Sequence, residues 1–267
     1  MATSKKNDQR REARERLRAE REAEVRRAKL RGRLMVGGAL VAVLAIAVGA
    51  GLYASNRSSG SDEATGKPFV RPANTTGKDG IVVPYGKADA KNVLTVWLDP
   101  RCPYCAGVET GLGKTFKEQA DAGKYRVEYH LATFLDGSLG GKGSKRAVNA
   151  LGAAVNESPE KFMEYLQVLY KNHPAKESDD KFGSTATLLE LADQVPGLRT
   201  PAFNQAVKEL TYMPWVEKVG KAFYDENING TPNVLINGTK ITLNSGVGID
   251  SITPDAFDKL IADKLKN

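Results

Sequence analysis

Residues 93–105 read VLTVWLDPRCPYC and contain the only two cysteines of the 267-residue chain. The apolar and β-branched residues 93–98 predict a buried strand. Residues 106–122 predict a helix, although two glycines weaken that prediction near its middle. The cysteines, Cys102 and Cys105, are therefore expected at the turn from a strand to a helix, with the second one turn inside.

This position favours redox chemistry. Residues three apart share one face of a helix, so the two sulfurs are close enough to bond. The free N–H groups and the dipole of the first turn favour negative charge, which predicts a stabilised, attacking thiolate at Cys102. Cys105 lies deeper and is predicted to be the resolving thiol. Pro103 suits a first helical turn, where a missing N–H matters little.

A structural zinc site and a purely structural disulfide are the alternatives. Zinc usually takes four ligands. The chain has no second cysteine pair, and its only histidines, His130 and His173, are far apart in the sequence. A disulfide across so small a loop removes little entropy from the unfolded state. A redox-active pair is therefore the favoured interpretation, and the surrounding elements have to support it.

The basic character of the chain belongs to its first residues. Residues 1–33 carry the whole net charge of +7, and the remaining residues carry equal numbers of acidic and basic groups. This arm is rich in Arg, Glu and Ala and is expected to be a solvated cytoplasmic helix. A nucleic-acid-binding role for the rest of the chain therefore has no electrostatic support.

A membrane anchor is predicted directly after the arm. Residues 34–54 carry no charge, and as a helix they would span about 31 Å, the thickness of a bilayer core. A cleaved signal peptide would have a shorter apolar region and a shorter basic start. The positive-inside rule places the arm in the cytoplasm and the part after Ser55 outside it, where disulfide chemistry is useful. Residues 55–80, rich in small and polar residues, are expected to form a flexible tether.

Residues 81–267 are predicted to form one exported domain. A helix between the strands expected at 92–98 and 124–135 implies a parallel, right-handed crossover. The other expected elements are a short strand at 81–83, a long helical region at about 144–227, strands at 231–236 and 239–243 joined by Asn237-Gly238, and a last helix opening at Thr253-Pro254.

This order resembles the thioredoxin fold, an α/β fold, with a helical insertion. More closely, it is similar to the membrane-anchored bacterial form of the DsbA-like thiol–disulfide oxidoreductases. The residues that carry the resemblance are Asp99 to Cys105 and Gly230-Thr231-Pro232. It implies that the Thr231–Pro232 bond is cis and faces the cysteines, with a backbone edge on which a substrate peptide lies as an added strand.

Val96, Asp99 and Tyr104 stand at positions that have a characteristic residue in the family. Members often carry an acidic residue six positions before the first cysteine, where this chain has Val96. Asp99 matches a common family aspartate and is expected to be partly exposed and to influence the thiolate, or to be simply a strand-end residue. Tyr104 replaces the histidine of the best-known oxidants, so the thiolate has one positive stabiliser fewer.

The resemblance implies an extracytoplasmic enzyme of the bacterial cell membrane, with one membrane pass. It would donate disulfides to exported proteins with free thiols and be reoxidised by a quinone-linked membrane partner. No cofactor is expected, and a monomer is the default. One alternative is a reductase or isomerase that uses the same pair. The other is a metal-binding or metal-delivery module on the same fold, with His130 as an extra ligand.

Overall fold

Five strands form one mixed sheet in the computed structural model, which describes residues 63–243 and 253–266. Their order across the sheet is β1-β3-β2-β4-β5. The strands are β1 (Val82–Tyr85), β2 (Val93–Leu98), β3 (Arg126–Leu131), β4 (Asn233–Ile236) and β5 (Thr239–Ile241). β2 and β3 are parallel, as expected, whereas β1 joins β3, β4 joins β2 and β5 joins β4 in antiparallel fashion.

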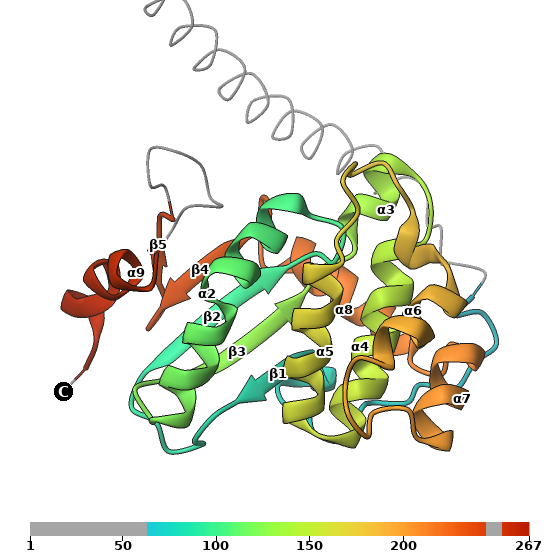
Figure 1. The fold of residues 1–267 in the computed structure, drawn as a ribbon, viewed down its shortest axis with the longest axis horizontal. Helices are drawn as coiled ribbons and strands as arrows, with labels where there is room; N and C mark the ends of the chain where they lie inside the picture. Colours follow the sequence, from blue (N-terminus) through green and yellow to red (C-terminus); the bar gives the residue numbers. More distant parts are fainter. Residues whose placement is uncertain (1–62, 244–252, 267) are drawn as a thin grey trace, which may run out of the picture. The chain divides into compact units, whose positions relative to one another are not determined.

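Helices connect and cover these strands (Figure 1). α2 (Pro103–Asp121) links β2 to β3. The insertion between β3 and β4 contains α3 (Phe134–Leu139), α4 (Gly143–Glu157), α5 (Pro159–Lys171), η2 (Lys181–Gly183), α6 (Thr185–Ala192), α7 (Pro201–Glu209) and α8 (Met213–Asp225). Two further elements are the short 3-10 helix η1 (Lys78–Gly80) before β1, and α9 (Pro254–Ile261) with its 3-10 extension η4 (Ala262–Lys264) near the C-terminus.

Several helices begin where local sequence signals predict. The hydroxyl groups of Ser158, Thr200 and Thr253 each accept a hydrogen bond from the backbone N–H three residues later. Each of these residues is followed by a proline at the first helical position, where its missing N–H leaves no bond unmade. The start of α9 at Thr253-Pro254 therefore confirms the sequence prediction, and α5 and α7 begin with the same combination of cap residue and proline.

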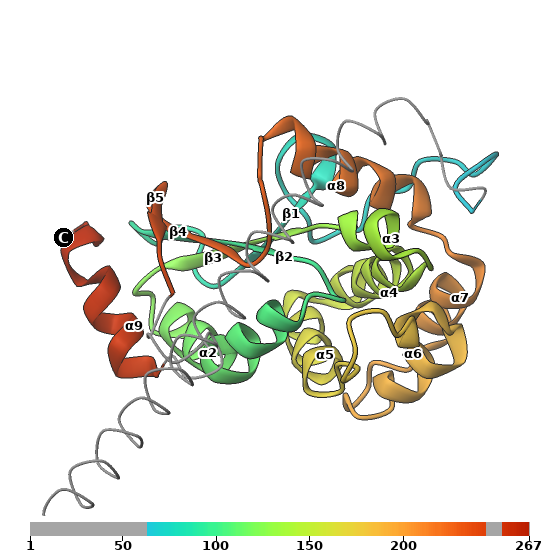
Figure 2. The same cartoon turned by 90° about the horizontal axis from the view of Figure 1, so that it is seen from above.

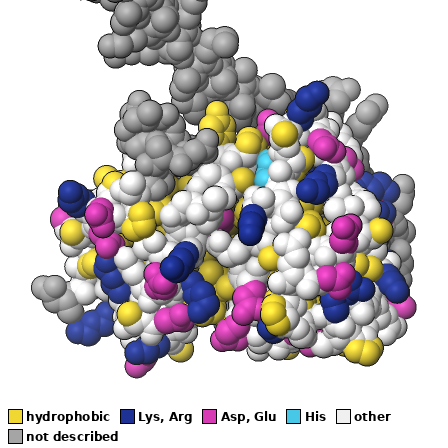
Figure 3. All heavy atoms as spheres, in the orientation of Figure 1, with side chains coloured by type: hydrophobic (Ala, Val, Ile, Leu, Met, Phe, Trp, Pro, Cys, Tyr) yellow, Lys and Arg dark blue, Asp and Glu magenta, His cyan; other side chains and the backbone are white. Residues whose placement is uncertain are grey.

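The sheet has a helical layer on each face (Figure 2). On one face Tyr129 of β3 packs against Phe162 of α5, with ring centroids 5.5 Å apart, and α2 packs against α9. On the other face Trp97 of β2 meets Phe223 of α8 at 6.2 Å. The buried alternation along β2 and β3 follows from the two-residue period of a strand. In Figure 3 acidic and basic side chains are interspersed over the visible face, in keeping with a net charge of zero after residue 33.

The tether prediction is wrong for residues 63–80. This segment lies against the helical insertion. The Asn74 amide donates to the carbonyl of Val155 at 2.8 Å, and the Trp215 indole donates to the carbonyl of Gly80 at 2.8 Å. Small and polar residues therefore serve here as hydrogen-bonding partners of the helices rather than as a free spacer. The folded unit begins before residue 81.

The predicted arm, the predicted membrane span and the first residues of the predicted tether lie outside the described residues. Within residues 63–243 and 253–266, none of the helices is long and apolar enough to cross a membrane.

Candidate active site

The cysteine pair stands at the start of α2, as the sequence predicts. Cys102 precedes the helix as its N-terminal cap residue, and its carbonyl accepts the first helical hydrogen bond from Ala106 at 3.1 Å. The N–H of Cys102 donates to the carbonyl of Asp99 at 2.9 Å and so closes the turn after β2. Pro103 occupies the first helical position. Cys102 thus lies at the positive end of the helix, although its sulfur caps none of the first-turn N–H groups.

Both sulfurs are sheltered from water. Cys102 is 4 % exposed, Cys105 is fully buried, and both are free thiols. Burial raises the pKa of Cys105 well above its ordinary value, the neighbouring Cys102 raises it further, and the Thr231 hydroxyl acts in the opposite direction. Cys105 therefore holds its proton more firmly than an ordinary thiol. The division between an attacking thiol, Cys102, and a resolving thiol, Cys105, stays a prediction.

The loop before β4 approaches the same sulfurs. The Thr231–Pro232 peptide bond is cis, in agreement with the expectation from the sequence. The thiol of Cys102 donates to the carbonyl oxygen of Thr231 at 3.3 Å. The pairing of β4 with β2 brings the two segments together, since Asn233 stands opposite Trp97 in the sheet. Residues 129 positions apart in the sequence thus form one site.

Asp99 is fully buried, so the expectation of a partly exposed carboxylate is wrong. Its Oδ1 accepts hydrogen bonds from the Ser144 hydroxyl at 2.6 Å and from the Arg101 N–H at 3.0 Å, and its Oδ2 accepts from the Leu135 N–H at 3.2 Å. The start of α4 covers the turn that the sequence suggested would be open. Burial raises the pKa of Asp99 to about 7, although these hydrogen bonds act in the opposite direction.

The two residues between the cysteines, Pro103 and Tyr104, are exposed at the first turn of α2. Thr231 and Pro232 are half-buried. The exposed part of the first turn of α2 is therefore formed by the two residues between the buried cysteines.

Sequence reasoning did not assign a role to a second buried carboxyl, that of Glu109. Val96, at the position where relatives carry an acid, is buried and pairs in register with Tyr129. The Glu109 carboxyl enters the same region from α2 and accepts a hydrogen bond from Gln167 at 2.6 Å. Burial raises its pKa to about 8, while the Tyr129 hydroxyl and Gln167 lower it. Its spacing of four residues from Cys105 was the available signal.

Two further polar side chains beside the cysteines had no predicted role. Tyr170 of α5 donates its hydroxyl to the carbonyl of Asp99 at 3.1 Å. Arg101 is 1 % exposed and directly precedes Cys102. For Arg101, the sequence signal that could have been used was a charged residue directly after an apolar strand.

His130 lies on the sheet face opposite Tyr129, as its position in the strand predicts. Its ring packs against that of Trp97 with centroids 4.4 Å apart and planes tilted by 31°. Burial lowers its pKa to about 4, so it is neutral near pH 7. Within the part of the chain that the structure describes, no three His, Cys, Asp or Glu side chains are grouped to hold a metal ion.

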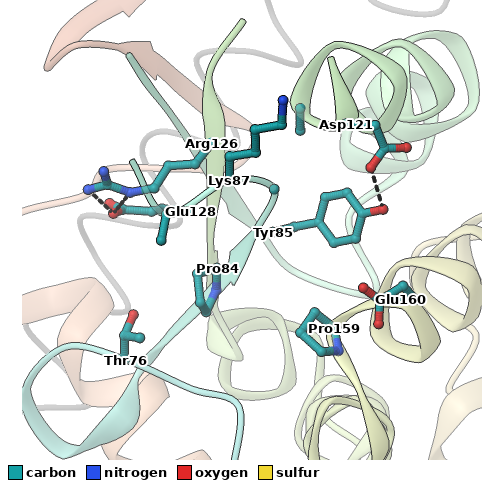
Figure 4. A pocket seen from close by; sticks show the side chains of 12 residues that line it. Thr76, Pro84, Tyr85, Lys87, Asp121, Arg126, Glu128, Pro159 and Glu160 are labelled. Atoms are coloured by element: carbon teal, nitrogen blue, oxygen red, sulfur yellow. Dashed lines mark hydrogen bonds and ion pairs between the residues drawn. The ribbon is translucent and has the colours of Figure 1, made fainter. Parts of the chain in front are cut away.

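Figure 4 shows a hollow of about 710 Å³. It is lined by residues of β1, β3, the end of α2 and the start of α5, and the Tyr85 hydroxyl donates there to Asp121 at 2.8 Å. Asp121 ends the 19-residue helix that Cys102 precedes, so roughly 27 Å of helix separates the two places. The hollow contains none of the predicted site residues.

Two thiols at a helix start, facing a cis proline on an α/β sheet, define a thioredoxin-like redox domain. A family model described as Thioredoxin matches residues 78–263, and the chain belongs to that family.

Known relatives have the same fold. The chain is 23 % identical over 179 residues to Disulfide bond formation protein D of Bacillus subtilis (strain 168), a match that covers 67 % of this chain and 73 % of that protein. MdbA, a thiol-disulfide oxidoreductase from Actinomyces oris, has a TM-score of 0.59 at 20 % identity over 79 % of this chain and 96 % of that one. Oxidised BdbD from Bacillus subtilis has a TM-score of 0.58 at 20 % identity over 74 % and 100 %.

Proposed function

We propose that this chain is a DsbA-like thiol–disulfide oxidoreductase that donates its Cys102–Cys105 disulfide to exported proteins. One observation carries the proposal: the Cys102 sulfur lies 3.3 Å from the carbonyl oxygen of Thr231, next to the cis Pro232. A peptide that approaches this edge as an added strand would bring its own sulfur to Cys102. The name of the Bacillus relative supports the same activity.

The proposed reaction consists of two exchanges. A substrate thiolate attacks the Cys102 sulfur, a mixed disulfide forms, and the electron pair of the broken bond leaves on Cys105. A second substrate thiolate then attacks the substrate sulfur of the mixed disulfide and releases the Cys102 thiolate. The substrate has lost two electrons and gained a disulfide, and the enzyme has become a dithiol.

Burial of Cys105 helps the first exchange to proceed. Because its pKa is raised well above the ordinary value, the released thiolate takes up a proton at neutral pH. A protonated thiol is a poor nucleophile, so Cys105 does not immediately attack the mixed disulfide again.

The direction of electron flow is a separate part of the proposal. A disulfide donor has a reduction potential near that of DsbA, about −120 mV, whereas a reductase has one near that of thioredoxin, about −270 mV. Equilibration of the pair with glutathione measures this potential. A value close to that of thioredoxin would replace the oxidase by the reductase or isomerase alternative.

The proposed location is the outer side of a bacterial cell membrane, with residues 34–54 as a single anchor and residues 1–33 in the cytoplasm. The basic arm before an uncharged run of 21 residues supports this orientation. Reoxidation would come from a quinone-linked membrane partner, and the protein would act as a monomer. Protease added to intact spheroplasts should digest residues 63–267 and leave the arm protected; digestion of the arm alone would contradict the orientation.

Two single substitutions test the chemistry. Oxidation of a two-cysteine peptide should fall to the uncatalysed rate in Cys102→Ser, because the exchanging sulfur is gone. Cys105→Ser should instead trap a mixed disulfide between Cys102 and an activated substrate thiol, visible on a non-reducing gel. Wild-type activity in Cys102→Ser would overturn the proposal.

A further inference from the structure

The guanidinium of Arg101 is buried in the turn that carries Cys102. Its side chain is 1 % exposed, and Nη1 forms an ion pair with Asp136 at 2.8 Å. A second carboxylate, that of Asp180, lies 3.6 Å from the same nitrogen. Buried charges usually have such partners, because an unpaired charge in the interior is strongly unfavourable.

The same guanidinium also donates to two backbone carbonyls. Nη1 reaches the carbonyl of Gly140 at 2.6 Å, and Nη2 reaches the carbonyl of Glu177 at 3.3 Å. Gly140 follows α3, and Glu177 lies in the loop between α5 and η2. One side chain from the active-site turn therefore joins two separate segments of the helical insertion.

The carboxylates around Arg101 in turn hold the start of α4. Asp136 accepts the N–H groups of Ser144 and Lys145, both at 2.9 Å. Asp180 accepts the N–H of Gly143 at 2.7 Å. These N–H groups belong to the first turn of the helix and have no partner within it. Arg101 is thus attached, through Asp136 and Asp180, to the start of α4.

The backbone of the turn is fastened to the same place. Oδ1 of Asp99 accepts both the Arg101 N–H at 3.0 Å and the Ser144 hydroxyl at 2.6 Å. The backbone carbonyl of Asp99 accepts the Cys102 N–H at 2.9 Å. Side chain and backbone of the residue before Cys102 are therefore both tied to the start of α4.

The charge of Arg101 is compensated where it lies. Two carboxylates lie 2.8 and 3.6 Å from its Nη1 and supply the opposite charge. What remains is a geometric constraint, since a planar fork satisfies several acceptors in fixed directions. A lysine ammonium at this position would keep the charge and lose that fork.

We propose that Arg101 is a positioning residue of the redox site. Its guanidinium clasps the turn of Cys102 to the helical insertion and so holds the Cys102 sulfur where it can close the disulfide with Cys105. This role rests on the proposed function. When the clasp is absent, the turn is looser, the two thiols meet less often, and the disulfide is less stable relative to the dithiol.

The test is the equilibrium of the full-length protein with reduced and oxidised glutathione, measured for wild type and four variants. Arg101→Met and Asp136→Asn remove opposite charges but break the same clasp. Both should lower the equilibrium constant for closing the Cys102–Cys105 disulfide about tenfold, which makes the reduction potential of the pair about 30 mV less negative. Arg101→Lys should give a shift of the same sign and smaller size.

Arg199→Met is the matched control. Arg199 also binds a carboxylate and a carbonyl, those of Asp193 at 2.8 Å and Leu189 at 2.7 Å, between α6 and α7. Its loss should lower the unfolding midpoint and leave the potential unchanged. Circular dichroism establishes which variants fold; if Arg101→Met does not, Asp136→Asn and Arg101→Lys answer the question.

The outcomes separate the possibilities. Shifts of opposite sign in Arg101→Met and Asp136→Asn would mean that Arg101 acts through its charge, and would overturn the positioning role. Potentials equal to that of wild type would reduce Arg101 to a structural residue. If the wild-type pair does not exchange with glutathione at all, the proposed function falls, and the positioning role falls with it.

Discussion

The carboxyl groups of Asp99 and Glu109 are fully buried within one domain. Burial raises the pKa of Asp99 to about 7 and that of Glu109 to about 8. In the unfolded chain both would ionise near pH 4. Between the pKa near 4 in the unfolded chain and the pKa of about 7 or 8 in the folded protein, the folded protein binds more protons than the unfolded one. The free energy of unfolding therefore decreases as pH rises through this range. Their stabilising contribution is complete below about pH 4 and is lost as pH rises to about 8.

The raised pKa values of Asp99 and Glu109 predict how uncharged substitutions change the pH dependence of stability. The free energy of unfolding of the reduced protein should decrease between pH 5 and pH 8, and Asp99→Asn and Glu109→Gln should each make this decrease shallower. The expected change is a few kcal/mol across the range for each group. Urea unfolding at several pH values measures it. Asp225→Asn, at an exposed position, is the control, and equal slopes in all four proteins would contradict the prediction.

At the scale of one element, α2 shows why a glycine stands inside a helix. A side chain at Gly113 would overlap the amide of Gln167 and the carboxyl of Glu109, and would separate the pair that hydrogen-bonds at 2.6 Å. Gly113→Ala should therefore destabilise the protein by about 1–3 kcal/mol through overpacking, despite the better helix propensity of alanine. Gly111 is exposed on the same helix.

Gly111→Ala is thus the matched control for Gly113→Ala. It should stabilise the protein by up to about 1 kcal/mol, the difference in helix propensity between the two residues. Thermal unfolding of both variants gives the comparison. If both substitutions stabilised the protein, the side chains of Gln167 and Glu109 would not limit the size of the residue at position 113.

Elements with a local signal were predictable from the sequence. The caps of α5, α7 and α9 each join residues three positions apart, and the Asn237-Gly238 turn lies between two adjacent strands. The burial of Asp99 was not predictable, because it depends on Ser144, 45 positions away. The partners of Arg101 and Glu109 were not predictable for the same physical reason. Arg101 binds Asp136 and Glu177, 35 and 76 positions away, and Glu109 binds Gln167, 58 positions away.

At the scale of the whole molecule, the segment before β1 belongs to the fold. Besides the contacts of Asn74 and Gly80, the Thr76 N–H donates to the carbonyl of Val82 at 2.8 Å, and the Val82 N–H returns a bond at 3.1 Å. These two bonds extend the edge of the sheet beyond β1. Pro84, two residues further along the same strand, has no N–H to offer to another chain, which limits edge-to-edge pairing.

A truncation series follows from this arrangement. A protein that begins at residue 81 loses the hydrogen bonds of Asn74, Thr76 and Gly80, whereas one that begins at residue 63 keeps them. At about 1 kcal/mol for each hydrogen bond, the shorter protein should be less stable by roughly 2–4 kcal/mol. Urea unfolding of the two reduced proteins measures the difference.

A substitution at Glu63 distinguishes the stability that comes from the hydrogen bonds of this segment from the stability that comes from its ion pairs. Its carboxylate pairs with Arg146 at 2.6 Å and with Lys142 at 3.0 Å, at a partly exposed site. Such pairs contribute at most about 1 kcal/mol, so Glu63→Ala in the longer protein should be nearly as stable as its parent. If Glu63→Ala were as unstable as the protein starting at residue 81, the ion pairs rather than the backbone contacts would hold the segment. Equal midpoints for the two truncations would instead return it to the role of a tether.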